Sequence, residues 1–427
     1  MLRSMFSAIS GLKAHQTKLD VAGNNIANVN TVGFKGSTTV FEDTLSQVLR
    51  NGSSPNGETA GTNPAQVGLG VKVAGISTNF GQGSAQSTGR AEDFMITGDG
   101  FFVVNQGGEN LYTRAGSFSL DGVGNLVTPD GAILQGWMAD AQGNVNTLGG
   151  TEPLKIQSGQ VLAPVATSGT AISGNLSASA ATGDTPVTSE ITMYDDLGNA
   201  HVMSVTLERT AVANQWSLTV QEGTNAPVIN GALLDFGSTG AATGQLTAPT
   251  TADPQTSPAS DGDGKYMSFT PPAGSSWAGD VRIDLSSLTQ FGGKSDAAVK
   301  TTADSGSPLG ILQSYSLSGD GTIVGLYSGG RRQAIGQLAM ATFVNPGGLE
   351  KAGNSSYRAG DNSGNPLIGA AGTGGRGSLT SGALEMSNVD LAEEFTGLIV
   401  AQRGFQANSR VITTSDEILQ DLVQLKR

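Results

Sequence analysis

Apolar residues recur every seven or so positions at both ends of the chain, a spacing that places them on one face of a helix. Near the N-terminus these positions are Leu2, Met5, Ile9, Leu12, Leu19 and Ile26. Near the C-terminus they are Leu391, Phe395, Leu398, Phe405, Ile412 and Leu419. The pattern predicts an amphipathic helix within residues 1–27 and a longer one within residues 388–427.

The boundaries of both helices have their own sequence signals. The first helix is expected to end in the stretch Asn24-Asn25-Ile26-Ala27-Asn28, because asparagine is a poor helix former and a good turn former. The second is expected to start at Ser387-Asn388-Val389-Asp390, a Ser-x-x-Asp arrangement that resembles a capping box. The C-terminal helix has the more continuous pattern.

Between the helices the pattern changes to short strands separated by Gly and Asn turns. The best defined strands are residues 101–104, 112–114, 117–120, 126–128, 133–135, 190–194, 202–207 and 216–220. The turn signature Asp-x-x-Gly-Asn begins at Asp121, Asp140, Asp195 and Asp361. Its glycine is expected to adopt a positive φ and to close a hairpin.

A shift in composition divides this β region. Ala, Thr, Ser and Pro accumulate between residues 156 and 298, which we interpret as an inserted, outer β domain. The remaining segments, 91–155 and 299–375, would then form one discontinuous β domain. Residues 28–90 and 376–387 are expected to be extended connections. The predicted fold class is α+β and multidomain: a helical coiled-coil domain from residues 1–27 and 388–427, plus two mainly antiparallel β domains.

Composition excludes several classes of function. The chain has 427 residues, with 23 Lys and Arg against 36 Asp and Glu, and the net charge of −13 disfavours nucleic acid or an anionic membrane as a partner. Cysteine is absent, which excludes disulfides, thiolate zinc sites, cysteine nucleophiles and cysteine cross-links. His15 and His201 are the only histidines, so a histidine-rich metal site is also excluded. We find no secretory leader and no stretch long enough to cross a bilayer.

The sequence motifs do not indicate an enzyme or a cofactor site. Gly372, Gly374 and Gly377 match G-x-G-x-x-G, but the β-α-β context of a dinucleotide site is missing, so we interpret them as a flexible linker. The segment from Asp261 to Gly264 begins like a calcium loop but continues with Lys265 and Tyr266, which indicates a plain turn. We therefore predict no catalytic residues, no cofactor and no metal, and a protein that is not an enzyme.

The two terminal stripes need a partner, because a helix of about 25 residues that contains Gly11 and Gly23 is marginal alone. Pairing the two helices with each other and with copies in neighbouring subunits would bury both stripes. A head-to-tail contact that does not close generates a helical filament. The alternative is an ordinary helical hairpin within one chain.

Several motifs together resemble those of the bacterial flagellar rod and hook proteins. The N-terminal signature comprises Asn24, Asn25, Ile26, Ala27, Asn28, Gly33, Phe34 and Lys35. Residues 97–104, 112–118 and 134–137 resemble the β-domain motifs of this family, and residues 387–391 and 401–409 resemble its C-terminal helix. The length and the insert of about 140 residues favour a hook-type member, with a distal rod-type axial protein as the alternative.

The resemblance implies a function. A hook-type subunit would self-assemble into a curved, flexible tube that joins rod to filament and transmits motor torque as a universal joint. Its implied partners are copies of itself, the rod, the hook cap, the hook–filament junction proteins and the type III export apparatus. It would be cytoplasmic before export and extracellular, in the hook and basal body, afterwards. A distant alternative is a secreted Gly-rich adhesin or polysaccharide-active enzyme, which would need clustered carboxylates that the sequence does not show.

Overall fold

The computed structural model describes residues 2–55, 60–157, 159–238, 240, 243–250, 257–258, 265–271, 276–277, 279–302 and 304–424. The chain divides into two compact units. The first comprises Met1–Gln157, Tyr315–Val324 and Ala334–Arg427, and the second comprises Ser158–Ser314 and Gly325–Gln333. The boundary falls within three strands: β25 (Gly310–Leu317), β26 (Thr322–Tyr327) and β27 (Arg332–Leu338).

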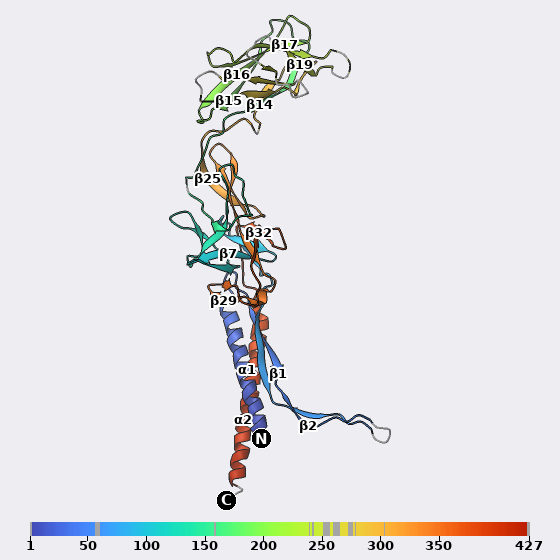
Figure 1. Ribbon diagram of the computed structural model, residues 1–427, viewed down its shortest axis with the longest axis vertical. Helices are drawn as coiled ribbons and strands as arrows, with labels where there is room; N and C mark the ends of the chain where they lie inside the picture. Colours follow the sequence, from blue (N-terminus) through green and yellow to red (C-terminus); the bar gives the residue numbers. More distant parts are fainter. Residues whose placement is uncertain are drawn as a thin grey trace. The chain divides into compact units, whose positions relative to one another are not determined.

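The first unit contains both helices, α1 (Leu2–Ala27) and α2 (Leu391–Gln424). This confirms the prediction of two terminal helices. They lie side by side (Figure 1) and run antiparallel, since Asn25 near the end of α1 bonds to Glu394 near the start of α2. Neither helix carries, in its described residues, an apolar stretch long enough to cross a bilayer.

The start of α2 corrects one detail of the prediction. The Asp390 carboxylate accepts hydrogen bonds from the backbone N–H groups of Ala392 (2.8 Å) and Glu393 (3.4 Å). Asp390 is therefore the residue that caps the helix. The hydroxyl of Ser387 instead accepts a bond from the backbone N–H of Val389, one turn too early to act on the helix.

A long hairpin follows α1 in the segment that the sequence predicted as a connection. Strand β1 (Ser37–Asp43) pairs antiparallel with β4 (Val71–Thr78), and β2 (Ser46–Arg50) pairs with β3 (Ala65–Gly68). Figure 1 shows β1 beside the two helices. Two further pairs lead back toward α2: β5 (Ala85–Ser87) with β33 (Ala383–Glu385), and β6 (Phe94–Thr97) with β32 (Ser378–Ser381).

The remainder of the first unit is a set of short, mainly antiparallel strands. Their order is β27-β11-β7-β8-β30-β29, with β9, β10, β12, β28 and β31 attached along it. The bounds are β7 (Phe101–Gln106), β8 (Glu109–Thr113), β9 (Ser119–Leu120), β10 (Leu126–Val127), β11 (Ile133–Met138), β12 (Glu152–Pro153), β28 (Met340–Thr342), η2 (Pro346–Gly348), β29 (Glu350–Gly353), β30 (Ser356–Arg358) and β31 (Leu367–Gly369). Phe101, Tyr112, Phe343 and Tyr357 pack edge to face in their core.

The second unit is built mainly from two sheets, and it also contains β13, which pairs with β25. One has the order β15-β16-β17-β18-β19, and the other has β20-β21-β22-β14-β23 with β24 also paired to β14. The bounds are β13 (Val161–Leu162), β14 (Gly169–Ser177), β15 (Val187–Tyr194), β16 (Ala200–Arg209), β17 (Gln215–Glu222), β18 (Ile229–Phe236), β19 (Leu246–Thr250), β20 (Ser257–Pro258), β21 (Tyr266–Phe269), β22 (Val281–Asp284), β23 (Leu288–Phe291) and β24 (Ala298–Lys300). Strand β14 pairs parallel with β22 and β23, an exception to the expected antiparallel pattern.

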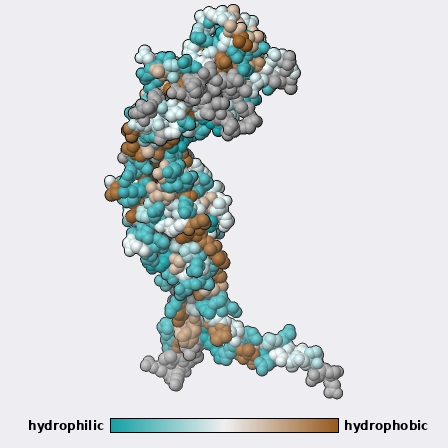
Figure 2. All heavy atoms as spheres, turned by 45° about the horizontal axis from the view of Figure 1, so that its top comes forward, coloured by the Kyte–Doolittle hydropathy of each residue, from teal (hydrophilic) through white to brown (hydrophobic). Residues whose placement is uncertain are grey.

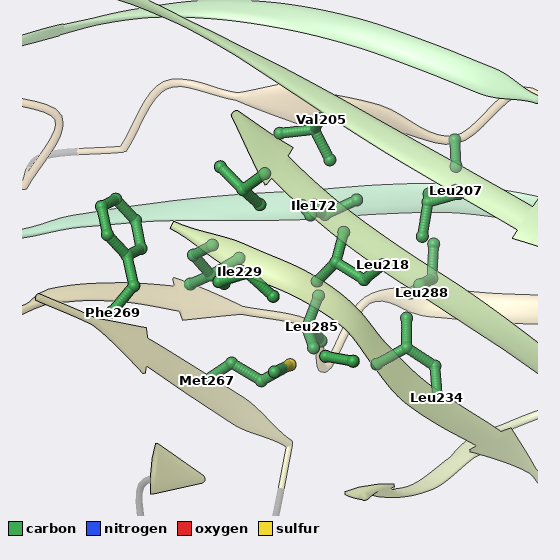
Figure 3. Packing of buried hydrophobic residues seen from close by; sticks show 14 of the residues in the cluster. Ile172, Val205, Leu207, Leu218, Ile229, Leu234, Met267, Phe269, Leu285 and Leu288 are labelled. Atoms are coloured by element: carbon green, nitrogen blue, oxygen red, sulfur yellow. The ribbon is translucent and has the colours of Figure 1, made fainter. Parts of the chain in front are cut away.

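The apolar faces of these two sheets form one core. Alternate residues of β16, β17 and β18 are buried, as period-two strands require. Figure 3 shows their side chains in the same cluster as Ile172, Met267, Phe269 and Leu288 from the other sheet. The second unit thus buries its own apolar side chains within itself.

Three of the four Asp-x-x-Gly-Asn turns form as predicted. In each, the Asp carboxylate accepts bonds from the backbone two and four residues ahead and from the Asn side chain. The glycines Gly124, Gly143 and Gly198 have φ of 91°, 86° and 81°. The turn at Asp361 differs: Gly364 keeps a positive φ of 77°, but the side chain that bonds there is that of Ser363.

The hydrogen bonds in these turns lower the pKa values of the aspartates. The side chain of Asn125 lowers the pKa of Asp121, and the backbone N–H of Asn144 lowers that of Asp140. At Asp195 burial acts to raise the pKa, but the hydrogen bonds from Asn199 and Leu197, together with the nearby His201 ring, outweigh it and the pKa is lowered. All three turns are therefore held by ionised carboxylates.

Candidate self-assembly surface

Small residues line the contact between α1 and α2. The buried positions of α1 are Ala8, Gly11, Ala14, Ala22 and Asn25. On α2 the buried positions are Ala401 and Ser415, and the half-buried Glu394 and Asn408 continue the same seven-residue spacing. We call this contact the seam. A Cβ atom at Gly11 would lie 2.8 Å from Nδ2 of Asn408, and one at Gly404 would lie 2.5 Å from Nε2 of His15, so the helices approach each other as closely as they do because these residues are glycines.

The predicted apolar stripe lies beside the seam on α1 and flanks it on α2. On α1, Ile9, Leu12 and Ile26 directly follow the buried residues Ala8, Gly11 and Asn25, which corresponds to a rotation of about 100° around the helix. On α2, Leu398, Phe405, Ile412 and Leu419 stand three or four positions from the residues of the seam, on the edge of the same face. The half-buried members are Met5, Leu12, Leu19, Ile26, Leu398, Ile412 and Leu419, and the exposed members are Ile9, Leu391, Phe395 and Phe405. The side chain of Leu2 lies outside the described residues. The role of the stripe in self-assembly stays a prediction.

Large apolar side chains on the outside of the helix pair are therefore open to solvent. They are Phe6, Ile9, Leu391, Phe395, Ile399, Val400, Phe405, Val411 and Ile418. Phe395 is 50% exposed and Phe6 is 64% exposed, unusual values for aromatic residues of a soluble protein. Large apolar side chains exposed along both helices indicate an interaction site.

The long hairpin adds a second row of exposed apolar residues that the sequence reasoning missed. They are Val40, Phe41, Leu45, Val48, Leu49, Val67, Leu69, Val71 and Ile76. Apolar residues of this part of the chain are visible at the bottom of Figure 2. The alternation in Val71-Lys72-Val73 was the available signal for a strand. We call these nine residues and the nine on the helices the outward apolar surface.

The family motif lies where α1, α2 and the hairpin meet. Asn25 is buried, and its side chain bonds to both backbone groups of Ser37 (N–O 3.0 Å and 2.8 Å) as well as to Glu394. Asn388 acts in the same way just before α2. Its side chain accepts a bond from the N–H of Gly36 and donates to the carbonyls of Asn79 and Gly81.

Lys35 and Glu385 form a fully buried ion pair at this junction. The Lys35 ammonium lies 2.6 Å from one Glu385 oxygen and 2.8 Å from the carbonyl of Gly81, and both side chains are 0% exposed. The other oxygen of Glu385 lies 3.3 Å from the guanidinium of Arg114, which is 2% exposed. Burial lowers the pKa of Lys35, and the hydrogen bond and charge of Glu385 offset that effect only in part.

Other residues of the motif shape the loop after α1. Asn28 bonds back to the carbonyl of Asn24, which satisfies the end of the helix. Gly33 has a φ of 67°, and a Cβ there would collide with the backbone of Ala115, so only glycine fits. Phe34 lies beneath the ammonium of Lys351, 5.5 Å from it. Ile26 is half-buried and Ala27 is exposed.

The residues that the sequence analysis weighed for chemistry lie apart in the described structure. In the part of the chain that the structure describes, no cluster of three His, Asp or Glu residues could hold a metal ion. His201 lies between Glu222 (Nδ1–Oε1 2.6 Å) and Asp195 (Nε2–Oδ2 3.7 Å), so the two carboxylates flank opposite sides of the ring. The loop at Gly372 closes on itself through a bond to Gly377. Residues 261–264 lie outside the described part.

Four family models match the chain. They are described as flagella basal body rod protein (residues 5–35), flagellar hook protein FlgE/F/G D1 domain (95–175), flagellar basal body protein FlaE D2 domain (166–306) and flagellar basal body rod FlgEFG protein C-terminal (380–425). The first and last cover the two helices and the junction. The D2 model lies entirely within the second unit.

Full-length relatives agree with these matches. The chain is 39% identical over 452 residues to the flagellar hook protein FlgE of Borreliella burgdorferi, with 100% of both chains covered. It is 33% identical over 428 residues to the flagellar basal-body rod protein FlgG of Bacillus subtilis, again with 100% of both covered. A solved structure of the Helicobacter pylori flagellar hook protein FlgE2 covers 70% of this chain and 100% of its own, with a TM-score of 0.47 and 14% identity.

Proposed function

The chain belongs to the flagellar hook protein family and is a structural subunit of the flagellar hook, and we propose that it polymerises with itself through its outward apolar surface. The single observation that carries this proposal is the position of the large apolar residues. The helix pair closes on alanines and glycines and leaves Phe395, Ile399 and Phe405 in water. A chain that used its helices only for its own stability would bury these residues inside the pair.

The polymer would supply the missing contacts. In a helical array the same surface patch of each copy meets a different patch of the next copy, so the contact repeats without closing. We propose that residues 1–27 and 388–427 of neighbouring copies pack side by side in a coiled-coil layer. The heptad stripe from Leu391 to Leu419 has the spacing for such packing, and all its members are half-buried or exposed in the single chain.

The hook setting extends the proposal. A short curved tube of such subunits would join rod to filament and transmit torque as a universal joint, in a structural role without catalysis. The chain would leave the cytoplasm unfolded through the type III export apparatus and assemble outside, in contact with the rod, the hook cap and the hook–filament junction proteins. Marginal terminal helices that order at the growing end are compatible with that route.

A rod-type axial protein is the second candidate, supported by the 33% identity to a rod protein of similar length. The two candidates predict different polymers. A hook subunit forms curved tubes that bend, whereas a rod subunit forms straight, rigid ones. The hook assignment has the stronger support, because the hook relative is more similar over the same full length.

Negative-stain microscopy of the purified full chain under salting-out conditions tests the proposal. The wild-type chain is expected to form curved tubes, and a double variant Phe395→Ser with Ile399→Ser is expected to form none. Leu148→Ser, at an exposed residue in a turn between β11 and β12 of the first unit, serves as the matched control and is expected to form tubes. Straight wild-type rods would favour the rod candidate, and tubes from the double variant would refute the role of the outward apolar surface.

A further inference from the structure

Three charged side chains are buried together at the junction of the first unit. Lys35 follows α1, Glu385 ends β33 just before α2, and Arg114 follows β8. Glu385 receives both cations, one on each carboxylate oxygen, and its first oxygen also accepts the backbone N–H of Gly83 at 2.8 Å. We call Lys35, Glu385 and Arg114 the buried triad.

Stability alone does not explain the buried triad. Removing charges from water is costly, and apolar residues of similar volume in place of a buried ion pair often leave a protein as stable or make it more stable. The triad is also imperfect: Nε of Arg114 is buried and has no hydrogen-bond acceptor. The pKa of Lys35 is lowered, because burial penalises the charged ammonium more than Glu385 stabilises it. Such a group adds little net stability.

The triad instead fixes the relative positions of the segments that it joins. Apolar contacts tolerate sliding, whereas each of these hydrogen bonds joins two defined atoms. The Lys35 ammonium holds the segment after α1 to the carbonyl of Gly81, at the end of the long hairpin, and to the segment before α2. The backbone N–H of Gly33 donates to the carbonyl of Glu385 at 2.8 Å, which adds a second link between the same two segments.

Arg114 connects these links to the β strands. Its guanidinium reaches Glu385 and lies 5.4 Å from the ring centre of Phe101, a residue of the aromatic core. The triad therefore links four parts of the first unit: the segment after α1, the segment before α2, the end of the long hairpin and the β core. In both ion pairs of the triad, each side chain is at most 2% exposed.

We propose that Lys35, Glu385 and Arg114 are positioning residues for assembly, which fix how the helix pair joins the β strands and so determine which polymer the chain forms. This inference rests on the proposed function, that the chain polymerises. The three side chains of the triad are at most 2% exposed, so they present almost no surface of their own to a neighbouring copy. The triad acts through the helices, whose outward apolar surface can meet the next subunit in one register only if their attachment is fixed.

The test separates polymer geometry from stability. The variant Lys35→Met, Arg114→Met, Glu385→Leu replaces all three charges with apolar side chains of similar length. Its thermal midpoint is expected to lie within about 5 °C of wild type. Tubes examined by negative-stain microscopy are expected to be absent, or to differ from wild type in diameter and in the layer-line spacing of their power spectra.

Two matched variants accompany it. Arg358→Met with Glu109→Leu removes an exposed ion pair of the same unit and is expected to leave the tubes unchanged. Arg114→Lys keeps the charge and is expected to form tubes like those of wild type. Arg114 makes one contact with Glu385, which a lysine ammonium can replace without the forked guanidinium. If the triad only stabilised the fold, tubes would be lost or retained only together with a change in the thermal midpoint.

The outcomes are distinct. Wild-type tubes from the apolar triple variant would overturn the inference and leave the proposed function standing, whereas an absence of tubes from wild type would overturn both. If the triple variant is unfolded, the claim of low net stability is wrong, and Asn388→Ala decides the positioning role. That variant removes three junction hydrogen bonds without leaving a buried charge, and wild-type tubes from it would contradict the inference.

Discussion

The second unit and the terminal helix pair place their apolar residues in opposite ways. In the second unit Leu218, Val220 and Leu234 are fully buried between two sheets, and the polar residues of the same strands face outward. In the helix pair the residues that meet are small, and large ones such as Phe395 and Ile399 face solvent. One region has a core of its own, whereas the other has a surface without one.

The difference teaches that the hydrophobic pattern has to be interpreted together with residue size. A heptad of large residues and a heptad of smaller residues run along α2, three or four positions apart, and both have helical periodicity. The small heptad permits close approach within one chain, and the large heptad stays available for other copies. A region that satisfies itself should be sensitive to core substitutions, and a region that needs copies should be sensitive only in the polymer.

The largest effect is expected in the core of the second unit. Leu218→Ala removes a fully buried side chain from the central strand β17 and should lower the free energy of unfolding by about 2–5 kcal/mol. Leu197→Ala, at an exposed turn position of the same unit, should change it by less than about 0.5 kcal/mol. Denaturant titration of both variants measures the difference, and equal effects would contradict the description of this core.

A smaller effect is expected in the seam. Gly404→Ala places a methyl group against the His15 ring and should lower the stability of the helix pair by about 1–3 kcal/mol. Gly397→Ala, seven residues earlier, meets no atom and should raise it by up to about 1 kcal/mol through helix propensity. Circular dichroism at 222 nm during thermal unfolding distinguishes the two. A gain at both glycines would mean that the seam is not tightly packed.

The outward apolar surface should contribute almost nothing to the monomer. Phe395→Ser changes a half-exposed side chain and is expected to alter the free energy of unfolding by less than about 1 kcal/mol. Its effect should appear instead in the concentration of protein needed for sedimentable polymer, which should rise at least about tenfold. An unchanged sedimentation threshold would remove the distinction between the two regions.

The smallest effect concerns the Asp-x-x-Gly-Asn turns. The pKa of Asp121 is lowered in the folded chain from its ordinary value of 3.8, so its contribution is present above that pH and is lost as pH falls through the folded pKa. Asp121→Asn should therefore destabilise the chain slightly at pH 7 and make unfolding less dependent on pH below about 4. Thermal midpoints measured at several acidic pH values test this; a steeper dependence in the variant would contradict it.

Much of the architecture could be predicted from the sequence, because it depends on local pattern. The two helices, the strands around Phe101 and Trp216, and three of the four turns follow from periodicity and turn chemistry. The seam could not be predicted in this way, since alanine and glycine give a weak signal beside leucine and phenylalanine. The buried triad was also beyond reach. Lys35 and Glu385 are 350 residues apart, and only the tertiary fold places them in contact.

The candidate surface was predicted only in part for a related reason. The stripe from Leu391 to Leu419 was found by its spacing, but spacing alone does not say which face of a helix meets its partner. The hairpin residues from Val40 to Ile76 were missed because Gly and polar residues interrupt their alternation. Only the tertiary structure, in which β1 contacts α1, shows that these side chains are exposed.

The central claim is that the outward apolar surface is free in the monomer and covered in the polymer. Hydroxyl-radical footprinting of Phe395 and Phe6 in monomer and in sedimented tubes tests it directly, with Trp216, which is buried within the second unit, as the internal reference. We predict that labelling of both phenylalanines falls by at least about fivefold on polymerisation, while Trp216 stays protected in both states. Equal labelling of Phe395 and Phe6 in monomer and tube would contradict the claim.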